Sequence, residues 1–194
     1  GLSGPGKKSI SFSSLAAAAE AGGQPLKELG RFATKQREGT QFFVAQVAEI
    51  EIEPETGQLT ILKIVSVQDV GTVINPLTHQ GQIEGGMIQG VGFALMEDLL
   101  DQDGRIIAAN LGEYKIPNIR DIPRHETINI HYAPGPGPFG SKPIGENTTS
   151  PTAAAIANAV YDAIGIQIRD LPITSEKIYS ALKERRAQSC AAIR

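Results

Sequence analysis

Cysteine is nearly absent from this sequence, and its scarcity limits the chemistry that the chain can carry by itself. The 194 residues contain one cysteine, Cys190. A disulfide within the chain is therefore excluded, and so is an iron–sulfur cluster held by this chain alone, because such a cluster needs about four cysteine thiolates. The three histidines, His79, His125 and His131, lack the close spacing of metal ligands. We therefore expect no metal ion bound directly by these side chains.

Long apolar runs and a strong net charge are also missing. No apolar run reaches the roughly 18 residues of a membrane-spanning helix. The net charge of −3 gives no electrostatic support for binding nucleic acid or an anionic membrane. There is no signal peptide and no initiator methionine, and Gly1 opens a polar, glycine-rich stretch that is typical of an internal start. We expect a cytoplasmic protein with one sizeable core, since 41% of its residues are hydrophobic.

What the sequence does contain is a mixture of strand and helix patterns. Apolar and polar residues alternate over 47–52 and again over 59–70, which predicts two half-buried strands. The turn residues at 54–57 join them into an antiparallel hairpin. Further strands are expected at 105–116 and 126–133.

Helices are expected between and after these strands. The order of hairpin, helix, strands and further helices favours an α+β fold of antiparallel strands packed with helices over a Rossmann alternation. We divide the chain into a connector with a short helix (1–40), a main domain (41–186) and a tail (187–194). The predicted helices cover residues 15–21 after a Ser13 or Ser14 cap, 78–100, a stretch that begins after Ser150 and is ended by Gly165, and 175–186 after a Thr174 cap.

The stretch from Gly135 to Asn158 is the best candidate for chemistry. A loop rich in glycine and proline runs to Glu146, and its glycines would allow close backbone approach to a ligand. Ser150 is expected to cap the following helix, with Pro151 at its first position. Glu146 would then lie just upstream of a helix N-terminus, which favours its anion. The alternative interpretation is a solvated surface carboxylate beside a helix dipole.

Other motifs leave alternatives open. The glycines of the 78–100 helix indicate either tight packing against another backbone or a cofactor nearby. The GPGPFGSK segment is not a P-loop, because serine precedes lysine and no helix follows directly. A carboxylate pair such as Glu84 with Glu146 could serve glycoside hydrolysis.

Four segments in order resemble the C-terminal end of the molybdenum-binding subunit of the molybdenum hydroxylases, the xanthine dehydrogenase and aldehyde oxidase family. Each segment is weak alone, but their order and spacing are similar over residues 41–182, and more loosely over 10–40. The segments are Asp69–Pro76 (DVGTVINP), Gly81–Gly90 (GQIEGGMIQG), Gly112–Pro117 (GEYKIP) and Ser141–Glu146 (SKPIGE).

The resemblance implies the C-terminal half of a domain that binds molybdopterin or molybdopterin cytosine dinucleotide. Glu146 matches the family's general base, which takes a proton from a water-derived oxygen during hydroxylation of an aldehyde or N-heterocycle carbon. Gln82 matches a glutamine that holds the pterin. Ser141, Lys142 and Gly145, in the last segment, are also expected to bind cofactor.

The resemblance further implies partners. These are the remaining molybdopterin-binding part of the large subunit, iron–sulfur and FAD domains or subunits, and a small-molecule substrate. Two positions differ from the family's pattern: Pro143–Ile144 replaces a small residue and valine, and Asn147 follows the glutamate. Both are expected to touch the substrate. The alternatives are a non-catalytic fragment or partner-binding module of the same fold, and a carboxylate-based hydrolase.

Overall fold

A computed structural model describes residues 2–3, 9–33 and 41–191. The chain forms two compact units, Gly1–Thr34 and Lys35–Arg194. The smaller unit pairs strand β1 (Leu2–Ser3) with β2 (Ser9–Ile10) and continues into helix α1 (Phe12–Ala21). Ser11, and not the predicted Ser13 or Ser14, caps α1, because its hydroxyl accepts from the Ser14 N–H at 3.1 Å. Residues 24–33 carry no regular structure, as expected of a linker, and 34–40 lie outside the described residues.

The predicted hairpin forms the centre of the larger unit. Strand β3 (Val44–Ile52) pairs antiparallel with β4 (Leu59–Asp69). Gly57 takes a φ of +73° in the turn between them, where any residue with a Cβ would also meet the backbone of Ser175. Glycine is therefore required there by both conformation and space.

A β-bulge shifts the alternation of β4 by one residue. Glu49 pairs with Lys63 but Ile50 pairs with Ile61, so Leu62 is the extra residue. Leu59 and Ile61 face the core before the bulge, whereas the buried positions after it are Ile64, Ser66 and Gln68. The bulge thereby turns polar side chains of β4 inward near its end.

The third strand of the main sheet pairs parallel with its neighbour, whereas the two hairpin strands pair antiparallel. Strand β7 (Arg124–Ile130) pairs parallel with β4, giving the order β3-β4-β7. The α+β class is confirmed, and the main sheet is mixed. The prediction of a strand over 105–116 is wrong. Within that range the structure has strand β6 (Arg105–Ile106), which pairs with β5 (Asp101–Gln102) in a small hairpin. Asn110 ends the extended run there, because its side chain accepts from the Gly112 N–H at 2.8 Å and closes a turn.

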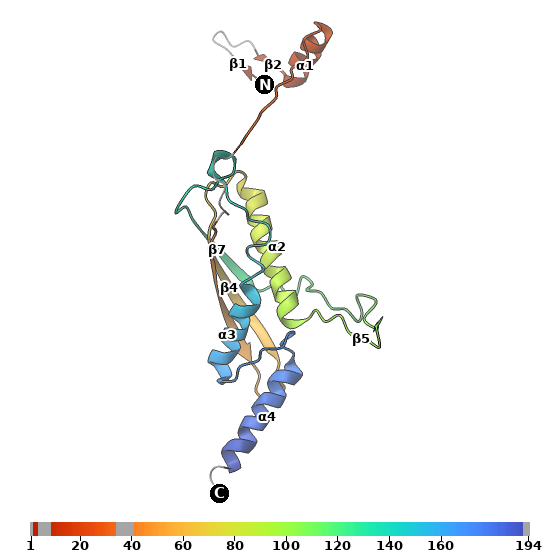
Figure 1. Cartoon of the computed structure of the whole chain (residues 1–194), viewed down its shortest axis with the longest axis vertical. Helices are drawn as coiled ribbons and strands as arrows, with labels where there is room; N and C mark the ends of the chain where they lie inside the picture. The colour runs from red at the N-terminus through yellow and green to blue at the C-terminus, as the bar shows by residue number, and fades with distance from the viewer. Residues whose placement is uncertain (1, 4–8, 34–40, 192–194) are drawn as a thin grey trace. The chain divides into compact units, whose positions relative to one another are not determined.

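Three α-helices complete the described part of the larger unit, and Figure 1 shows α2 and α3 beside the sheet while α4 extends beyond its end. They are α2 (Pro76–Leu95), α3 (Thr152–Ile164) and α4 (Ser175–Ala191). Asn75 caps α2 through its side-chain oxygen, so the helix begins before the predicted Thr78, and it ends before Leu100. Gly165 ends α3 in the left-handed region, and Thr174 caps α4, both as expected. The last helix runs past the predicted end at residue 186.

The core lies between one face of the sheet and the helices. Its buried apolar residues include Ile64 of β4, Met87 and Val91 of α2, and Ile156 and Val160 of α3. No helix in the described part of the chain is long and apolar enough to cross a membrane. The cellular location stays a prediction.

Candidate functional site

A pocket at the N-terminal end of α2 brings together predicted site residues that are distant in the sequence. Its volume is about 380 Å³. Gln82 contributes from α2, and Ser141 and Lys142 from the loop before Glu146. The other lining residues are Thr72, Ile74, Asn75, Thr78, His79 and Ile144. The wall is therefore rich in amide, hydroxyl and imidazole groups that can donate or accept hydrogen bonds.

The start of α2 forms one side of this pocket, and Asn75 and Pro76 fix where the helix begins. The Asn75 side-chain oxygen accepts from the N–H groups of Leu77 and Thr78, at 3.1 and 3.2 Å. Pro76 occupies a position where a missing N–H costs nothing. The pocket thus borders the positive end of a long helix dipole, which favours a polar or anionic group.

His79 adds a neutral imidazole to the same wall. Burial lowers the pKa of His79, and the nearby His131 lowers it further, while the side chain of Asn129 opposes the shift. The buried Nε2 atom has no hydrogen-bond partner among the described residues. A neutral ring of this kind can accept or donate to a ligand according to its tautomer.

Four of the five glycines of α2 divide into two pairs, and the fifth, Gly92, packs against Glu97 and Pro117. Gly86 and Gly90 face the start of α3: a Cβ on Gly90 would lie 2.5 Å from the Cβ of Thr152, and one on Gly86 would clash with Thr148. Gly81 and Gly85 have open space where a Cβ would be. Tight packing therefore explains one pair, while the other pair flanks the exposed Gln82 and leaves the helix backbone accessible.

The loop before Glu146 uses its glycines mainly to pack against itself and β4. A Cβ on Gly71 would lie 2.5 Å from the Gly140 oxygen, and one on Gly135 would lie 2.6 Å from the Lys142 Cγ. The Thr72 N–H also donates to the Gly140 oxygen at 3.1 Å. The expectation that these glycines admit a ligand is therefore corrected, although Gly145 does have open space around it.

Lys142 lines the pocket, but its ammonium group is already paired. The Lys142 Nζ lies 2.5 Å from the Asp69 Oδ2, and each side chain is 6% exposed. The hydrogen bond from Lys142 holds the pKa of Asp69 below its ordinary value, against the opposing effect of burial. The loop is thereby tied to the last residue of β4.

Glu146 is exposed and lies in a series of turns that precedes α3. The predicted Ser150 cap is wrong: α3 begins at Thr152, and Pro151 occupies the cap without a side-chain hydrogen bond. The Thr152 hydroxyl instead bonds the Thr148 oxygen at 2.8 Å. Glu146 is therefore separated from the helix by these turns, and a dipole effect that fades within one turn reaches it weakly.

Asn147 stabilises the loop from inside. It is 9% exposed, and its Nδ2 donates to the Pro143 oxygen at 2.6 Å. The expectation that Asn147 touches the substrate is therefore not supported by the position of its amide. Ile144 does line the pocket, so this departure from the family's pattern lies where a ligand would.

Sequence reasoning missed Gln46, which supports the turns after Glu146. Its Nε2 donates to the Thr148 oxygen at 2.9 Å, and its Oε1 accepts from the Thr152 hydroxyl at 2.7 Å. Gln46 lies on β3 in phase with the inward-facing Ala48 and Ile50. A polar residue at an inward strand position was the available signal, since buried amides need hydrogen-bond partners.

Glu84 does not have the environment of a glycosidase acid. Its Oε1 accepts from the Gln80 Nε2 at 2.8 Å and lies 2.9 Å from the His125 Nε2. Hydrogen bonds from Gln80 and His125 lower the pKa of Glu84. A general acid needs its pKa raised, so the carboxylate-pair alternative has no support here.

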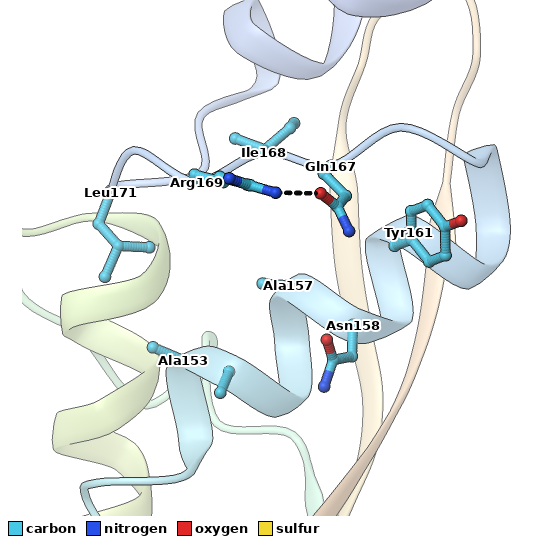
Figure 2. Close-up of a pocket in the computed structure, with 9 residues that line it drawn as sticks. Ala153, Ala157, Asn158, Tyr161, Gln167, Ile168, Arg169 and Leu171 are labelled. Atoms are coloured by element: carbon cyan, nitrogen blue, oxygen red, sulfur yellow. Dashed lines mark hydrogen bonds between the residues drawn. The ribbon is translucent and has the colours of Figure 1, made fainter.

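A second pocket, of about 410 Å³, lies between α3 and the segment after it (Figure 2). Ala153 and Ala157 form its floor, and Tyr161 and Leu171 lie at its margin. The Arg169 Nη2 donates to the Gln167 Oε1 at 2.7 Å above the alanines. This apolar groove contains no candidate acid, base or nucleophile in a suitable arrangement.

The chain is similar to known proteins in both sequence and fold. Residues 2–123 match the family of molybdopterin cofactor-binding domains. The chain is 34% identical to the aldehyde oxidoreductase molybdenum-binding subunit of Escherichia coli (strain K12), covering 81% of this chain and 22% of that protein. It is 35% identical to a probable xanthine dehydrogenase subunit from Bacillus subtilis (strain 168), covering 74% and 19%.

A solved aldehyde oxidoreductase from Desulfovibrio gigas has 29% identity and a TM-score of 0.72, covering 93% of this chain and 21% of that one. The chain therefore spans about a fifth of the length of the relatives that it matches. Over that span both the sequence and the arrangement of elements agree. The chain belongs to the molybdopterin cofactor-binding domain family, which it shares with molybdenum-binding subunits of xanthine dehydrogenases and aldehyde oxidoreductases.

Proposed function

We propose that this chain is the C-terminal cofactor-binding portion of a molybdenum hydroxylase that oxidises an aldehyde or N-heterocycle carbon with water. The observation that carries the proposal is the pocket in which Gln82 meets Ser141 and Lys142, directly before the exposed Glu146. Ligand sites of this kind combine a concave wall with a few convergent polar groups.

The residues of the pocket fit a pterin cofactor. The Gln82 side chain is exposed and has no hydrogen-bond partner among the described residues, so both its donor and acceptor are free for a ring edge. Ser141 offers a hydroxyl, and His79 has an unpartnered Nε2. Gly145 follows the lining residue Ile144 and leaves its backbone open. We assign Gln82, Ser141 and Gly145 to the site for molybdopterin or molybdopterin cytosine dinucleotide. Lys142 lines the same pocket, but its ammonium group is paired with Asp69 and is not offered to the cofactor.

When bound, this cofactor supplies the redox centre that takes the electrons of substrate oxidation. The chain's own contribution is proton transfer and positioning. Glu146 acts as the general base, because hydroxylation by water releases a proton and an exposed carboxylate on a braced loop can receive it. Iron–sulfur clusters would lie on other domains or subunits, since this chain has one cysteine. We propose the same for FAD.

The remainder of the large subunit is the proposed partner. One face of the main sheet is covered by helices, but the opposite face leaves apolar side chains in solvent: Val47 is 68% exposed, Ile128 44% and Ile130 46%. An apolar patch of this kind is typical of an interface. Two supporting relatives are named as subunits.

Glu146→Gln in the assembled enzyme tests the proposed base. Glutamine keeps the volume but cannot take up the proton, and loss of a general base costs about 10²–10⁴-fold in rate. We expect unchanged molybdenum content and a slow reduction by substrate in anaerobic stopped-flow experiments, with normal reoxidation. Glu176→Gln, in the exposed first turn of α4, is the control for a carboxylate beside a helix dipole. Reduction of Glu146→Gln within about threefold of wild type, far short of the range expected for a lost base, would contradict the proposal.

A further inference from the structure

A buried ion pair ties the Glu146 loop to the main sheet. Lys142 and Asp69 are 2.5 Å apart and nearly excluded from solvent. Asp69 is the last residue of β4, and its backbone N–H donates to the Phe43 oxygen at 2.9 Å. The carboxylate that receives Lys142 is therefore fixed by the sheet.

The aliphatic part of the Lys142 side chain is also closely packed. A Cβ on Gly71 would lie 3.1 Å from the Lys142 Cγ, and one on Gly135 would lie 2.6 Å from the same atom. An isolated β-bridge between Gly71 and Ser141 holds the backbone beside it. Lys142 therefore has little freedom to leave Asp69 and reach into the pocket.

The short chain between Lys142 and Glu146 is braced on both sides. Asn147 donates to the Pro143 oxygen at 2.6 Å, which closes the loop around Glu146. After Glu146, Gln46 of β3 holds the Thr148 oxygen at 2.9 Å. Glu146 therefore lies between two attached residues: Lys142, which is bonded to Asp69 of β4, and Thr148, which is bonded to Gln46 of β3.

We propose that the Asp69–Lys142 ion pair is a positioning device for Glu146, and that Lys142 acts through the loop and not by contact with substrate. This inference rests on the proposed function of Glu146. A base must be held close to its working position, because a displacement of about 1 Å can cost about 10²-fold in rate. An ion pair closed off from water suits this task, since neither partner can exchange its bond for one to solvent.

The test uses the complete enzyme with Lys142→Met, Asp69→Asn and the double variant. Each single variant is expected to slow reduction by substrate by about 10- to 100-fold, with KM and molybdenum content near wild type. Amide hydrogen exchange over residues 143–149 should accelerate in each. The double variant should lose no more than a single one, because both changes remove the same interaction.

The Arg186–Glu55 ion pair supplies the control. Its atoms are 3.4 Å apart, and the side chains are 57% and 77% exposed. Arg186→Met and Glu55→Gln should therefore change neither the rate nor the exchange of residues 143–149. If the neutral variants at 69 and 142 do not assemble, Lys142→Arg and Asp69→Glu keep the charges but change their reach. Both should slow reduction several-fold with molybdenum retained, and wild-type rates from both would overturn the proposal.

Two other results would also overturn it. One is unchanged exchange over residues 143–149 in both single variants. The other is a loss of molybdenum in Lys142→Met but not in Asp69→Asn, which would make Lys142 a direct cofactor ligand. The proposed role of Glu146 is tested separately. Normal turnover of Glu146→Gln would contradict its role as the base, whereas the hydrogen-exchange measurement tests the ion pair independently of that role.

Discussion

Polar side chains around Glu146 stabilise the loop itself as well as lining the proposed ligand site. Lys142 and Asn147 direct their polar groups into the loop and the sheet, while the Gln82 amide remains free at the pocket. A motif such as SKPIGE therefore combines residues that hold the backbone with residues that line the pocket, such as Ser141 and Ile144. Burial separates the two kinds, because a buried polar group is committed to the partner that satisfies it.

Gln82→Ala is predicted to weaken cofactor retention more than it alters the chemistry of the enzyme that remains loaded. The amide is exposed on α2 and lines the pocket, so its removal costs the fold little. We expect less molybdenum per enzyme, with turnover per molybdenum close to wild type. Metal analysis of the purified complex gives this ratio.

Gln89→Ala is the matched control for that experiment. Gln89 is on the same helix, farther from its start, and does not line the pocket. Its removal should leave molybdenum content unchanged. Equal molybdenum in both variants would count against a role for Gln82 in holding the cofactor.

At the scale of elements, helix α2 combines packing against α3 with an open side at the pocket. Gly86 and Gly90 allow α2 to approach Thr148, in the turns after Glu146, and Thr152, the first residue of α3. The same approach brings Gln82 toward the loop that carries Ser141. The glycine content of this helix is thus explained at these positions by close packing.

Alanine substitutions along α2 should therefore have opposite effects on stability. Gly85→Ala adds a methyl group in open space and should raise the free energy of unfolding by about 0.5–1 kcal/mol, the usual cost of glycine in a helix. Gly90→Ala forces a methyl group against Thr152 and should lower it by about 1–3 kcal/mol. Urea unfolding of the two variants measures both changes. Equal effects from the two substitutions would show that α2 does not pack in this way.

At the scale of the whole molecule, one face of the main sheet leaves apolar side chains exposed, and this is the face that we propose for the partner. Strands β3 and β7 are both edge strands of the main sheet, and their outward apolar residues include Val47 and Ile128. The chain also spans about a fifth of its relatives. A site with one wall from this chain would be completed by residues from the rest of the enzyme.

The isolated chain is accordingly predicted to show no hydroxylase turnover and to associate with the remaining molybdopterin-binding part. Ile128→Glu places a charge on the open face and should weaken that association by about tenfold or more, since an unpaired charge is costly to bury. Glu126→Gln, on the same face of β7, is the control. Co-purification of the separately expressed parts measures the effect, and full turnover by the 194 residues alone would contradict the prediction.

The sequence by itself determined the hairpin, the end of α3, the start of α4 and the four family segments. These features depend on local chemistry: strand alternation, Gly165 in the left-handed region and Thr174 as a cap. Only the tertiary structure decided that β7 pairs parallel with β4, that Lys142 pairs with Asp69, and that Gln46 donates to the Thr148 oxygen. Each of these contacts joins residues far apart in the chain, and no local preference encodes which partner satisfies a buried polar group. The Ser150 cap failed for the same reason, because Thr148 and Thr152 were drawn into bonds with each other and with β3, and α3 began later than its own sequence predicted.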